Sequence, residues 1–259
     1  MSKQIHIIGG GTVYHVRPHF ALAAMAYGRT VDALTDSLLA SINTYADDLD
    51  DYDSQTDIFA HKTRMAGGTT RSYAVDGERI TQTMFNAETN ADIAAKIDEI
   101  VANPDAKILF LPAALCDFEG SVVKDIFKNG VAGPTIKTPS GKDQARLRSD
   151  QNHTMLLEGA EKIVRRVRKD RKDIFLVAFK ATKSESVDEQ FQQGLRLLKT
   201  ASCNLVFAND LETGICMIIT PEQAKYSVTV DRNEAINTLV RMALMRSQGS
   251  FTRSTIVPG

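Results

Sequence analysis

Two apolar runs in the second half of the chain, Ile174-Phe-Leu-Val-Ala-Phe179 and Asn204-Leu-Val-Phe-Ala208, decide the fold. The segment between them has apolar residues at helical spacing and a helix-start signal, Ser186 followed by Glu189. A strand, a helix and a strand in this order predict parallel strands joined by a crossover helix. The alternation extends to both sides, so the sequence predicts a three-layer, Rossmann-like α/β fold with a mostly parallel sheet.

Polar side chains follow three of these predicted strands. Lys180 follows the first run, Asn209 and Asp210 follow the second, and Asp117 follows a third run, Ile108–Pro112. In an open parallel sheet, ligands bind just beyond the carboxyl ends of the strands. The sequence therefore predicts that one rim of the sheet carries a ligand site.

The remaining periodicities complete this prediction. They predict strands at 5–8, 57–63, 79–84 and 107–111, helices at 20–42 (with Gly28 as a candidate break), 93–101, 155–168 and 236–244, and a C-terminal antiparallel hairpin at 215–220 and 226–230. Residues 120–152 show no regular period, and the acidic stretch 45–53 is typical of a solvated loop. We expect a single α/β domain over 1–247 and a loose tail over 248–259.

Composition excludes several classes of protein. The chain has 259 residues and a formal net charge of -1, which gives no reason to expect a nucleic-acid or membrane partner. It shows no signal peptide and no apolar run of membrane length, so we expect a cytoplasmic protein. The three cysteines lack metal-ligand spacing and are predicted to be buried thiols rather than disulfides or a zinc site.

The segments at the predicted rim resemble those of the phosphopantothenate–cysteine ligase family, the ligase half of the bifunctional coenzyme A biosynthesis proteins. Ala113-Ala-Leu-Cys-Asp117-Phe is similar to the family's A-A-V-A-D-[FY] motif. Phe179-Lys-Ala-Thr182 is similar to its G-F-[AK]-A-E-T motif, and Asn209-Asp210 to its A-N-D motif. The resemblance covers roughly residues 105–245.

The resemblance implies a two-step ligation and a set of partners. The carboxylate of 4'-phosphopantothenate attacks the α-phosphate of CTP or ATP with Mg²⁺ present, and the amine of cysteine then displaces the nucleotide. Such chemistry needs positioning and neutralisation of charge rather than a nucleophilic side chain. Members of the family are dimers in which a segment of one subunit lies near the other's site, so the resemblance also implies a homodimer.

The same resemblance implies roles for individual residues. Asp117, Arg146 and Arg148 are the expected catalytic residues; the two arginines stand where the family has Lys-Ile-Lys in a basic loop, which could also be a merely solvated loop. The expected nucleotide-binding residues are Gly10, Gly11, Thr12, Ala113, Ala114, Asp117, Phe179, Lys180, Asn209, Asp210 and Lys225. Phe179 is expected to serve the core as well, and Asp117, Asn209 and Asp210 could alternatively cap turns. No resident metal site is expected.

The glycine run Gly9-Gly10-Gly11-Thr12 follows the first predicted strand. A run of this kind that leads into a helix suits close approach of the backbone to phosphate. It matches neither the spaced G-x-G-x-x-G nor a P-loop, so a tight turn after the strand is an equal alternative.

The chain departs from the family where the acid and its intermediate would bind. The stretch S-N-x-S-S-G-K-M-G is absent, and Val13–Phe20 stands in its place, with Tyr14, His15, Arg17 and His19 as candidate substitutes for the asparagine. The glutamate of A-E-T is replaced by Thr182-Lys183. Two further hypotheses therefore stand beside the ligase: a carboxylate–amine ligase with another substrate, and a nucleotide-binding protein without catalysis. A dinucleotide oxidoreductase is disfavoured because no acidic residue ends a second strand about 20 residues past the glycines. Residues 43–80, longer than in the family, could be a substrate loop or a dimer arm.

Overall fold

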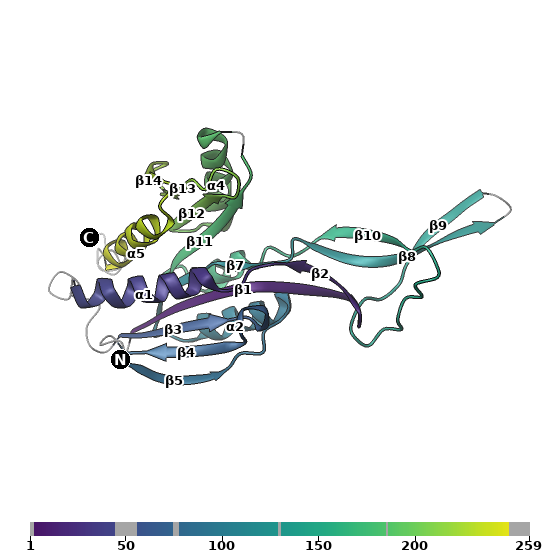
Figure 1. Ribbon diagram of the computed structural model, residues 1–259, viewed down its shortest axis with the longest axis horizontal. Coiled ribbons are helices and arrows are strands. Elements are labelled where there is room, and N and C mark those ends of the chain that lie inside the picture. The colour runs from purple at the N-terminus through teal and green to yellow at the C-terminus, as the bar shows by residue number, and fades with distance from the viewer. Residues whose placement is uncertain (1–2, 45–55, 75–77, 129–130, 185, 249–259) are drawn as a thin grey trace, which may run out of the picture.

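The structure is a computed structural model that describes residues 3–44, 56–74, 78–128, 131–184 and 186–248. Its main sheet has eleven strands, five of them in a parallel core, which confirms the predicted fold class (Figure 1). The central path runs in the order β14-β13-β12-β11-β6-β1-β3-β4-β5, and β2 and β7 both pair with β1. The predicted tail falls outside the described residues except for Gln248, and the acidic stretch 45–53 lies outside them entirely.

The bounds of the elements are as follows. The strands of the main sheet are β1 (Lys3–Arg17), β2 (Phe20–Ala24), β3 (Thr56–Lys62), β4 (Thr69–Tyr73), β5 (Arg79–Met84), β6 (Ala106–Leu111), β7 (Ala113–Ala114), β11 (Phe175–Thr182), β12 (Leu205–Asp210), β13 (Cys216–Ile219) and β14 (Lys225–Thr229). The helices are α1 (Arg29–Thr44), α2 (Asn90–Ala102), α3 (Arg166–Asp170), α4 (Val187–Ala201) and α5 (Arg232–Gln248), with short 3₁₀ turns η1 (Arg64–Ala66) and η2 (Ile163–Arg165).

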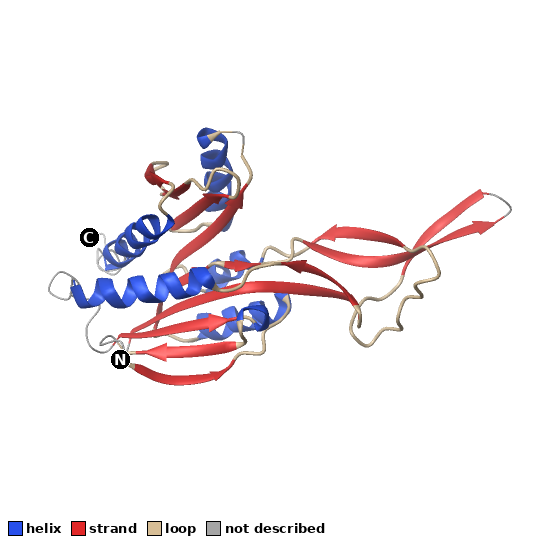
Figure 2. Ribbon diagram, viewed as in Figure 1, coloured by secondary structure: helices blue, strands red, loops and turns tan. Residues whose placement is uncertain are grey.

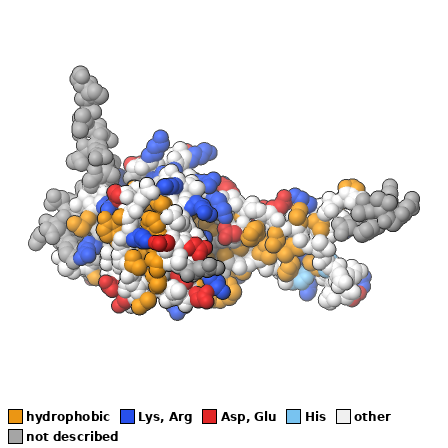
Figure 3. All heavy atoms as spheres, turned by 90° about the horizontal axis from the view of Figure 1, so that it is seen from above, with side chains coloured by type: hydrophobic (Ala, Val, Ile, Leu, Met, Phe, Trp, Pro, Cys, Tyr) orange, Lys and Arg blue, Asp and Glu red, His pale blue; other side chains and the backbone are white. Residues whose placement is uncertain are grey.

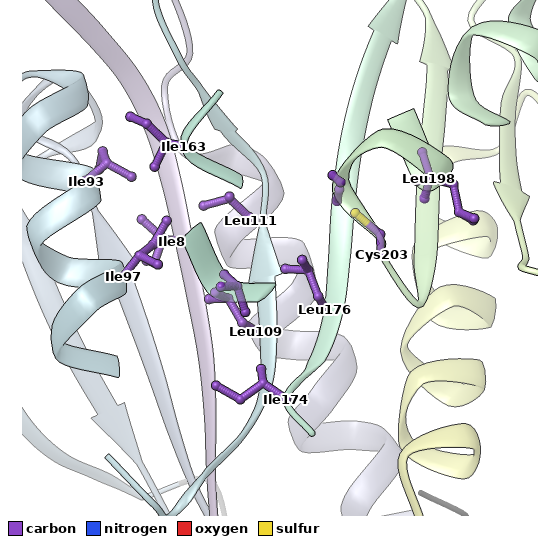
Figure 4. Packing of buried hydrophobic residues seen from close by; sticks show 14 of the residues in the cluster. Ile8, Ile93, Ile97, Leu109, Leu111, Ile163, Ile174, Leu176, Leu198 and Cys203 are labelled. Atoms are coloured by element: carbon purple, nitrogen blue, oxygen red, sulfur yellow. The ribbon is translucent and has the colours of Figure 1, made fainter. Parts of the chain in front are cut away.

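Helices cover both faces of the parallel strands and create two cores (Figure 2). Alternate residues of β1 divide between them: Ile5 and Ile7 face α1 and α5, whereas Ile8 faces α2. Figure 4 shows the second core, where Leu109 and Leu176 of the sheet lie among side chains of the helices. Because both faces are covered, these strands are continuous apolar runs rather than alternating ones.

Helix starts follow the expected side-chain chemistry. Thr89 caps α2 in a capping box with Asp92, and the Ser186 hydroxyl accepts a hydrogen bond from the Glu189 amide at 3.1 Å. Asp231 accepts from the first free amides of α5. The predicted C-terminal hairpin is confirmed as the antiparallel pair β13–β14.

The prediction that the glycine run ends the first strand is wrong. Strand β1 continues through all three glycines to Arg17, and each glycine packs against another segment. A Cβ on Gly9 would clash with Val31 of α1, one on Gly10 with Thr63, and one on Gly11 with the carbonyl of Ala24. Gly10 also has φ +106°, a conformation that side chains disfavour. The glycines therefore allow close approach of protein backbone and side chains along β1.

The helix predicted over 20–42 begins later than expected. Its first part is strand β2, which pairs antiparallel with β1 from Thr12 to Arg17. Gly28, at φ +79°, marks the break, and its carbonyl accepts the amide of Val31 at 2.9 Å in the first turn of α1. The candidate break is therefore the actual start of the helix.

A second, three-stranded sheet lies where the sequence predicts an irregular segment and a helix. Residues 120–152 were predicted to be irregular and 155–168 helical; instead β8 (Phe118–Lys128), β9 (Val131–Lys137) and β10 (Thr154–Gly159) pair antiparallel in the order β10-β8-β9. They form an arm that projects from the main sheet (Figure 1). Pairing with β8 overrides the helical periodicity of 155–168, of which only η2 and the short α3 remain helical.

Buried Arg17 fastens this arm to the main sheet. Its guanidinium donates to the carbonyls of Val16 and Pro139, and to the Thr138 hydroxyl at 2.7 Å. In the segment of unassigned role, 43–80, the described residues form β3, β4 and the first two residues of β5 at the edge of the main sheet.

The three cysteines are buried and free, as predicted, and burial raises the pKa of the Cys203 thiol to about 12. Among the described helices, none is long and apolar enough to cross a membrane.

Candidate functional site

A cavity of about 1360 Å³ opens at the carboxyl ends of β6, β11 and β12. After β1 the chain passes through α1 to β3, which pairs with one edge of β1. It later passes through α2 to β6, which pairs with the other edge of β1. The sheet order therefore reverses between β1 and β6, and the cavity is lined by Gly10 of β1 and by Leu111 of β6. Such a reversal point is where open α/β sheets bind ligands.

The structure brings seven of the predicted site residues to this cavity. They are Gly10, Ala113, Ala114, Asp117, Phe179, Lys180 and Asn209. They come from four strands and the segment after β7, so the predicted convergence of strand ends on one rim is what the fold produces. The small side chains of Ala113 and Ala114 leave the backbone accessible from the cavity.

Six predicted residues do not line the cavity. Gly11 packs against β2, and Lys225 pairs with Asp188 at 2.6 Å on the far side of α4. Arg146 and Arg148 lie in the loop between β9 and β10, where Arg148 pairs with Asp150 at 2.6 Å. Thr12 and Asp210 are buried, and their side chains form hydrogen bonds with the loops at the rim of the sheet.

Thr12 positions the segment that carries Asp117. Its hydroxyl donates to Asn90 Oδ1 at 2.8 Å and accepts from the amide of Cys116 at 2.9 Å. Asn90 Nδ2 donates in turn to the Cys116 carbonyl at 2.8 Å. Sequence reasoning missed Asn90 because its partner is 26 positions away along the chain.

Asp210 organises the loop after β12. Its carboxylate accepts the amides of Ser184, Glu212 and Thr213 and the hydroxyls of Thr182 and Thr213. These hydrogen bonds, with the Thr213 amide foremost, hold the pKa of this carboxyl well below its usual range. With its oxygens occupied in this way, Asp210 has the turn-forming role that was the alternative to ligand binding.

Strand alternation places Phe179 and Lys180 on opposite sides of the sheet. Phe179 packs against the core under α1 and α5, with its ring 5.4 Å from that of Phe207. Lys180 is half-buried on the α4 side and makes no hydrogen bond or ion pair with another described residue. A partly buried ammonium without a partner is costly, so Lys180 is available to an anion in the cavity.

Sequence reasoning missed most of the positive charge of the cavity. Besides Lys180, four cationic residues line it: Arg29, Lys162, Arg196 and Arg232. Arg29 follows Gly28, the predicted break, as the first residue of α1. Lys162 and Arg196 lie in segments predicted to be helical, where a charged residue is ordinarily solvated. Against these five cations stand two acidic lining residues, Asp117 and Glu189.

Asp117 and Lys162 form an ion pair at the mouth of the cavity. Lys162 Nζ lies 2.6 Å from Asp117 Oδ1, and the two side chains are 54% and 70% exposed. An exposed pair contributes little to stability, so a ligand can separate it at low cost. Both charges can then interact with a bound molecule.

The candidate substitutes for the family's asparagine lie elsewhere. Tyr14, His15 and Arg17 are on the arm-side half of β1, and none of them, nor His19, lines the cavity. The cavity wall before α1 consists instead of 24–28, Ala-Met-Ala-Tyr-Gly. Its only polar side-chain group is the Tyr27 hydroxyl.

Two carboxylates of the cavity are the candidate ligands for a divalent cation. Among the described residues, no group of three or more His, Cys, Asp or Glu side chains could hold a metal ion. Mg²⁺ is commonly held by one or two carboxylates together with substrate phosphates. Asp117 and Glu189 are the carboxylates that could contribute to such a site.

Solved structures share this fold over almost the whole chain. The DNA/pantothenate metabolism flavoprotein from Streptococcus pneumoniae matches with a TM-score of 0.64 at 15% identity, over 96% of this chain and 99% of that one. The C-terminal domain of the coenzyme A biosynthesis bifunctional protein CoaBC matches with a TM-score of 0.62 at 13% identity, over 95% and 96%. A mutant of Cab2 in complex with phosphopantothenate-cysteine matches with a TM-score of 0.61 at 13% identity, over 97% and 88%.

No protein-family model matches the sequence, and no curated protein matches it. At these identities the structural matches establish the fold, which is the one predicted from the alternation of strands and helices.

Proposed function

We propose that this protein is a divergent phosphopantothenate–cysteine ligase, a nucleotide-dependent enzyme that joins a carboxylate to an amine. The observation that carries the proposal is the cavity, which combines the rim motifs with five cations at the reversal point of the sheet. Its excess of positive charge suits the triphosphate of CTP or ATP together with a phosphorylated acid. The shared fold of the coenzyme A biosynthesis structures supports the same assignment.

The proposed reaction has two steps. A carboxylate oxygen of 4'-phosphopantothenate attacks the α-phosphorus of the nucleotide, and the bond to the β-phosphate oxygen breaks to release pyrophosphate. The amine of cysteine then attacks the acyl carbon, loses a proton, and expels the nucleoside monophosphate. Mg²⁺, when bound, would neutralise phosphate charge beside Asp117.

The described residues of the cavity would bind and orient the reactants. Lys180 and Lys162 would neutralise the phosphate oxygens, and Ala113 and Ala114 would allow the backbone to approach the nucleoside. Asn209 has no side-chain hydrogen bond to another described residue and would donate to, or accept from, the base or ribose. Positioning and electrostatic stabilisation are what phosphoryl and acyl transfer need most.

A second function is supported by one specific observation. Val13–Phe20, which stands in place of the family's S-N-x-S-S-G-K-M-G stretch, does not line the cavity, and the wall formed by 24–28 offers no asparagine, serine or lysine. A chain that keeps the nucleotide motifs and lacks this set would either activate another carboxylate or bind nucleotides without turnover.

Release of pyrophosphate tests these functions directly. The protein is mixed with CTP or ATP, Mg²⁺, 4'-phosphopantothenate and cysteine, and the amide product is detected by mass. Pyrophosphate release that requires phosphopantothenate and yields the amide is the expected result. Nucleotide binding in calorimetry without any release would refute the ligase and favour the binding protein.

We also propose that the protein acts as a homodimer in which the arm contacts a second copy. The arm exposes apolar side chains, among them Ile136 at 47% and Leu157 at 46% (Figure 3). In addition, Arg146 and Arg148 lie in a loop of the arm that does not line the cavity of their own chain. In a dimer this basic loop could reach the partner's cavity.

The double variant Ile136→Asp/Leu157→Asp is expected to be monomeric at concentrations where the wild type is dimeric. Burial of two carboxylates in an apolar interface should raise the dissociation constant more than ~100-fold. Light scattering coupled to size exclusion measures the mass. Met245→Asp, at a side chain 61% exposed on α5, is the matched control and should not change it. A wild type that is monomeric at high concentration would rule the proposal out.

A further inference from the structure

Arg232 of α5 is held in a fixed orientation at the cavity wall. Its Nη2 donates a hydrogen bond to the Thr30 hydroxyl at 2.9 Å, and its guanidinium carbon lies 5.3 Å from the centroid of the Phe207 ring. Thr30 belongs to the first turn of α1, and Phe207 is fully buried in β12. Both supports are therefore rigid, and stacking on an aromatic face keeps the guanidinium plane oriented.

The positive charge of Arg232 has no acidic partner in the part of the chain that the structure describes. The nearest carboxylates along the chain are otherwise occupied: Asp231 accepts the amides of Asn233 and Glu234, and Glu234 accepts from Thr229. The nearby Cys216 thiol supplies no negative charge because burial raises its pKa. A guanidinium has five N–H donors, of which Thr30 takes one and the Cys216 sulfur another, so further donors are left for a ligand.

A second arginine reinforces the same wall. Arg29 precedes Thr30, lines the cavity and forms no ion pair with another described residue. Phe179 and Asn209 line the cavity on this side of the sheet, whereas Lys180, Lys162 and Arg196 line its α4 side. The cavity thus has two cationic halves, one with two arginines and one with three cations.

We propose that Arg232, together with Arg29, binds the phosphomonoester of the acid substrate, apart from the half that receives the nucleotide's polyphosphate. This inference rests on the proposed function, which requires two phosphorylated reactants in one cavity. The planar fork of an arginine matches two oxygens of a terminal phosphate, and two arginines match its double charge. The half with three cations suits the more highly charged polyphosphate.

Calorimetry with 4'-phosphopantothenate, pantothenate, CTP and ATP tests the subsite without any turnover. In Arg232→Met, the affinity for phosphopantothenate should fall ~10–100-fold while that for the nucleotides changes little. Pantothenate, which lacks the phosphate, should bind wild type and variant equally weakly. Arg241→Met, an exposed arginine of the same helix outside the cavity, is the matched control and should bind as the wild type does.

Each further outcome decides between this subsite and its alternatives. Loss of nucleotide affinity alone in Arg232→Met would assign the arginine to the nucleotide phosphates and overturn the inference. An equal loss of affinity for pantothenate and phosphopantothenate would show a structural role and would also overturn the inference. If the methionine variant does not fold, Arg232→Lys, which keeps the charge, is measured in its place. Phosphate-dependent binding through Arg232 without pyrophosphate release would uphold the subsite and refute only the ligase.

Discussion

Replacing Lys180 with methionine is expected to lower kcat/KM for the nucleotide about 100-fold. Lys180 is a half-buried cation of the cavity, and no described residue satisfies its charge. In a partly desolvated site an ammonium interacts strongly with phosphate oxygens, and more strongly still with the charge that develops as pyrophosphate leaves. Methionine has a similar length and fills the same space, so the loss reflects charge rather than packing.

The measurement is steady-state release of pyrophosphate at varied nucleotide concentration, with the affinity from calorimetry beside it. Lys183→Met is the matched control: Lys183 lies three positions along, is 78% exposed, pairs with Glu212 at 3.7 Å and does not line the cavity. It should keep nearly full activity. A Lys180→Met enzyme within threefold of wild type in both turnover and nucleotide affinity would remove Lys180 from the site.

The rim of the cavity could be predicted because its signals are local. Each parallel core strand is covered on both faces, so it is a short continuous apolar run, and the polar residue at its end is read directly from the sequence. Asp117, Lys180 and Asn209 were identified in this way. Their convergence needs only the alternation of strands and helices, which is also a local pattern.

The walls of the cavity could not be predicted in the same way. Arg232 and Thr30 are 202 positions apart, and Lys162 meets Asp117 across 45 positions. No periodicity reports such contacts. Arg232 and Lys162 also lie in segments where a charged residue is ordinarily solvated, so only the folded arrangement shows that both line a cavity.

The predictions for the arm and for the glycine run were wrong for a different reason. Strands β8 and β10 include exposed apolar residues such as Leu156, Leu157 and Phe118, so they lack the pattern of a covered strand. Within β1, glycine is needed because α1, η1 and β2 pack closely against these positions. A glycine selected for close packing and one selected for a phosphate loop look alike in a sequence.

A buried histidine pair makes acid destabilisation the second large effect that we expect. His6 and His61 are 5% and 3% exposed, and their stacked rings lie between Phe59 and Phe85. Gln4 Oε1 accepts from Asn103 and therefore accepts from His6 Nε2 as well. His6 Nδ1 then accepts from His61 Nε2 at 3.2 Å, and His61 Nδ1 accepts from the Thr70 hydroxyl at 2.8 Å.

With both imidazoles neutral, this chain of hydrogen bonds is complete. A further proton on His6 would place its Nδ1–H against the Nε2–H of His61. A further proton on His61 would require the Thr70 hydroxyl to turn from donor to acceptor, and it would bury a positive charge. Burial, and after it the charge of Lys96, lowers the pKa of His6 from 6.5 to about 3. Burial likewise lowers the pKa of His61, and the neighbouring His6 and Lys96 add to the shift. Below pH 6.5 the histidines bind protons in the unfolded chain but not in the folded chain. Their contribution to the free energy of unfolding is therefore fully present above pH 6.5 and falls as the pH decreases below it.

At pH 5 the loss from His6 should be about 2 kcal/mol, since one pKa unit corresponds to about 1.4 kcal/mol, and His61 adds to this loss. The free energy of unfolding from urea titrations between pH 7.5 and pH 5 measures it. In His6→Phe/His61→Phe, which keeps the ring stack and removes both titrating groups, the decline over this range should shrink by at least about 2 kcal/mol, even though the variant is less stable at neutral pH. His19→Gln, at an exposed histidine, should leave the decline unchanged. If the histidines stay neutral in the folded state, the free energy of unfolding must decline more steeply in the wild type than in the double variant. An equal decline in both would mean that other groups control acid unfolding.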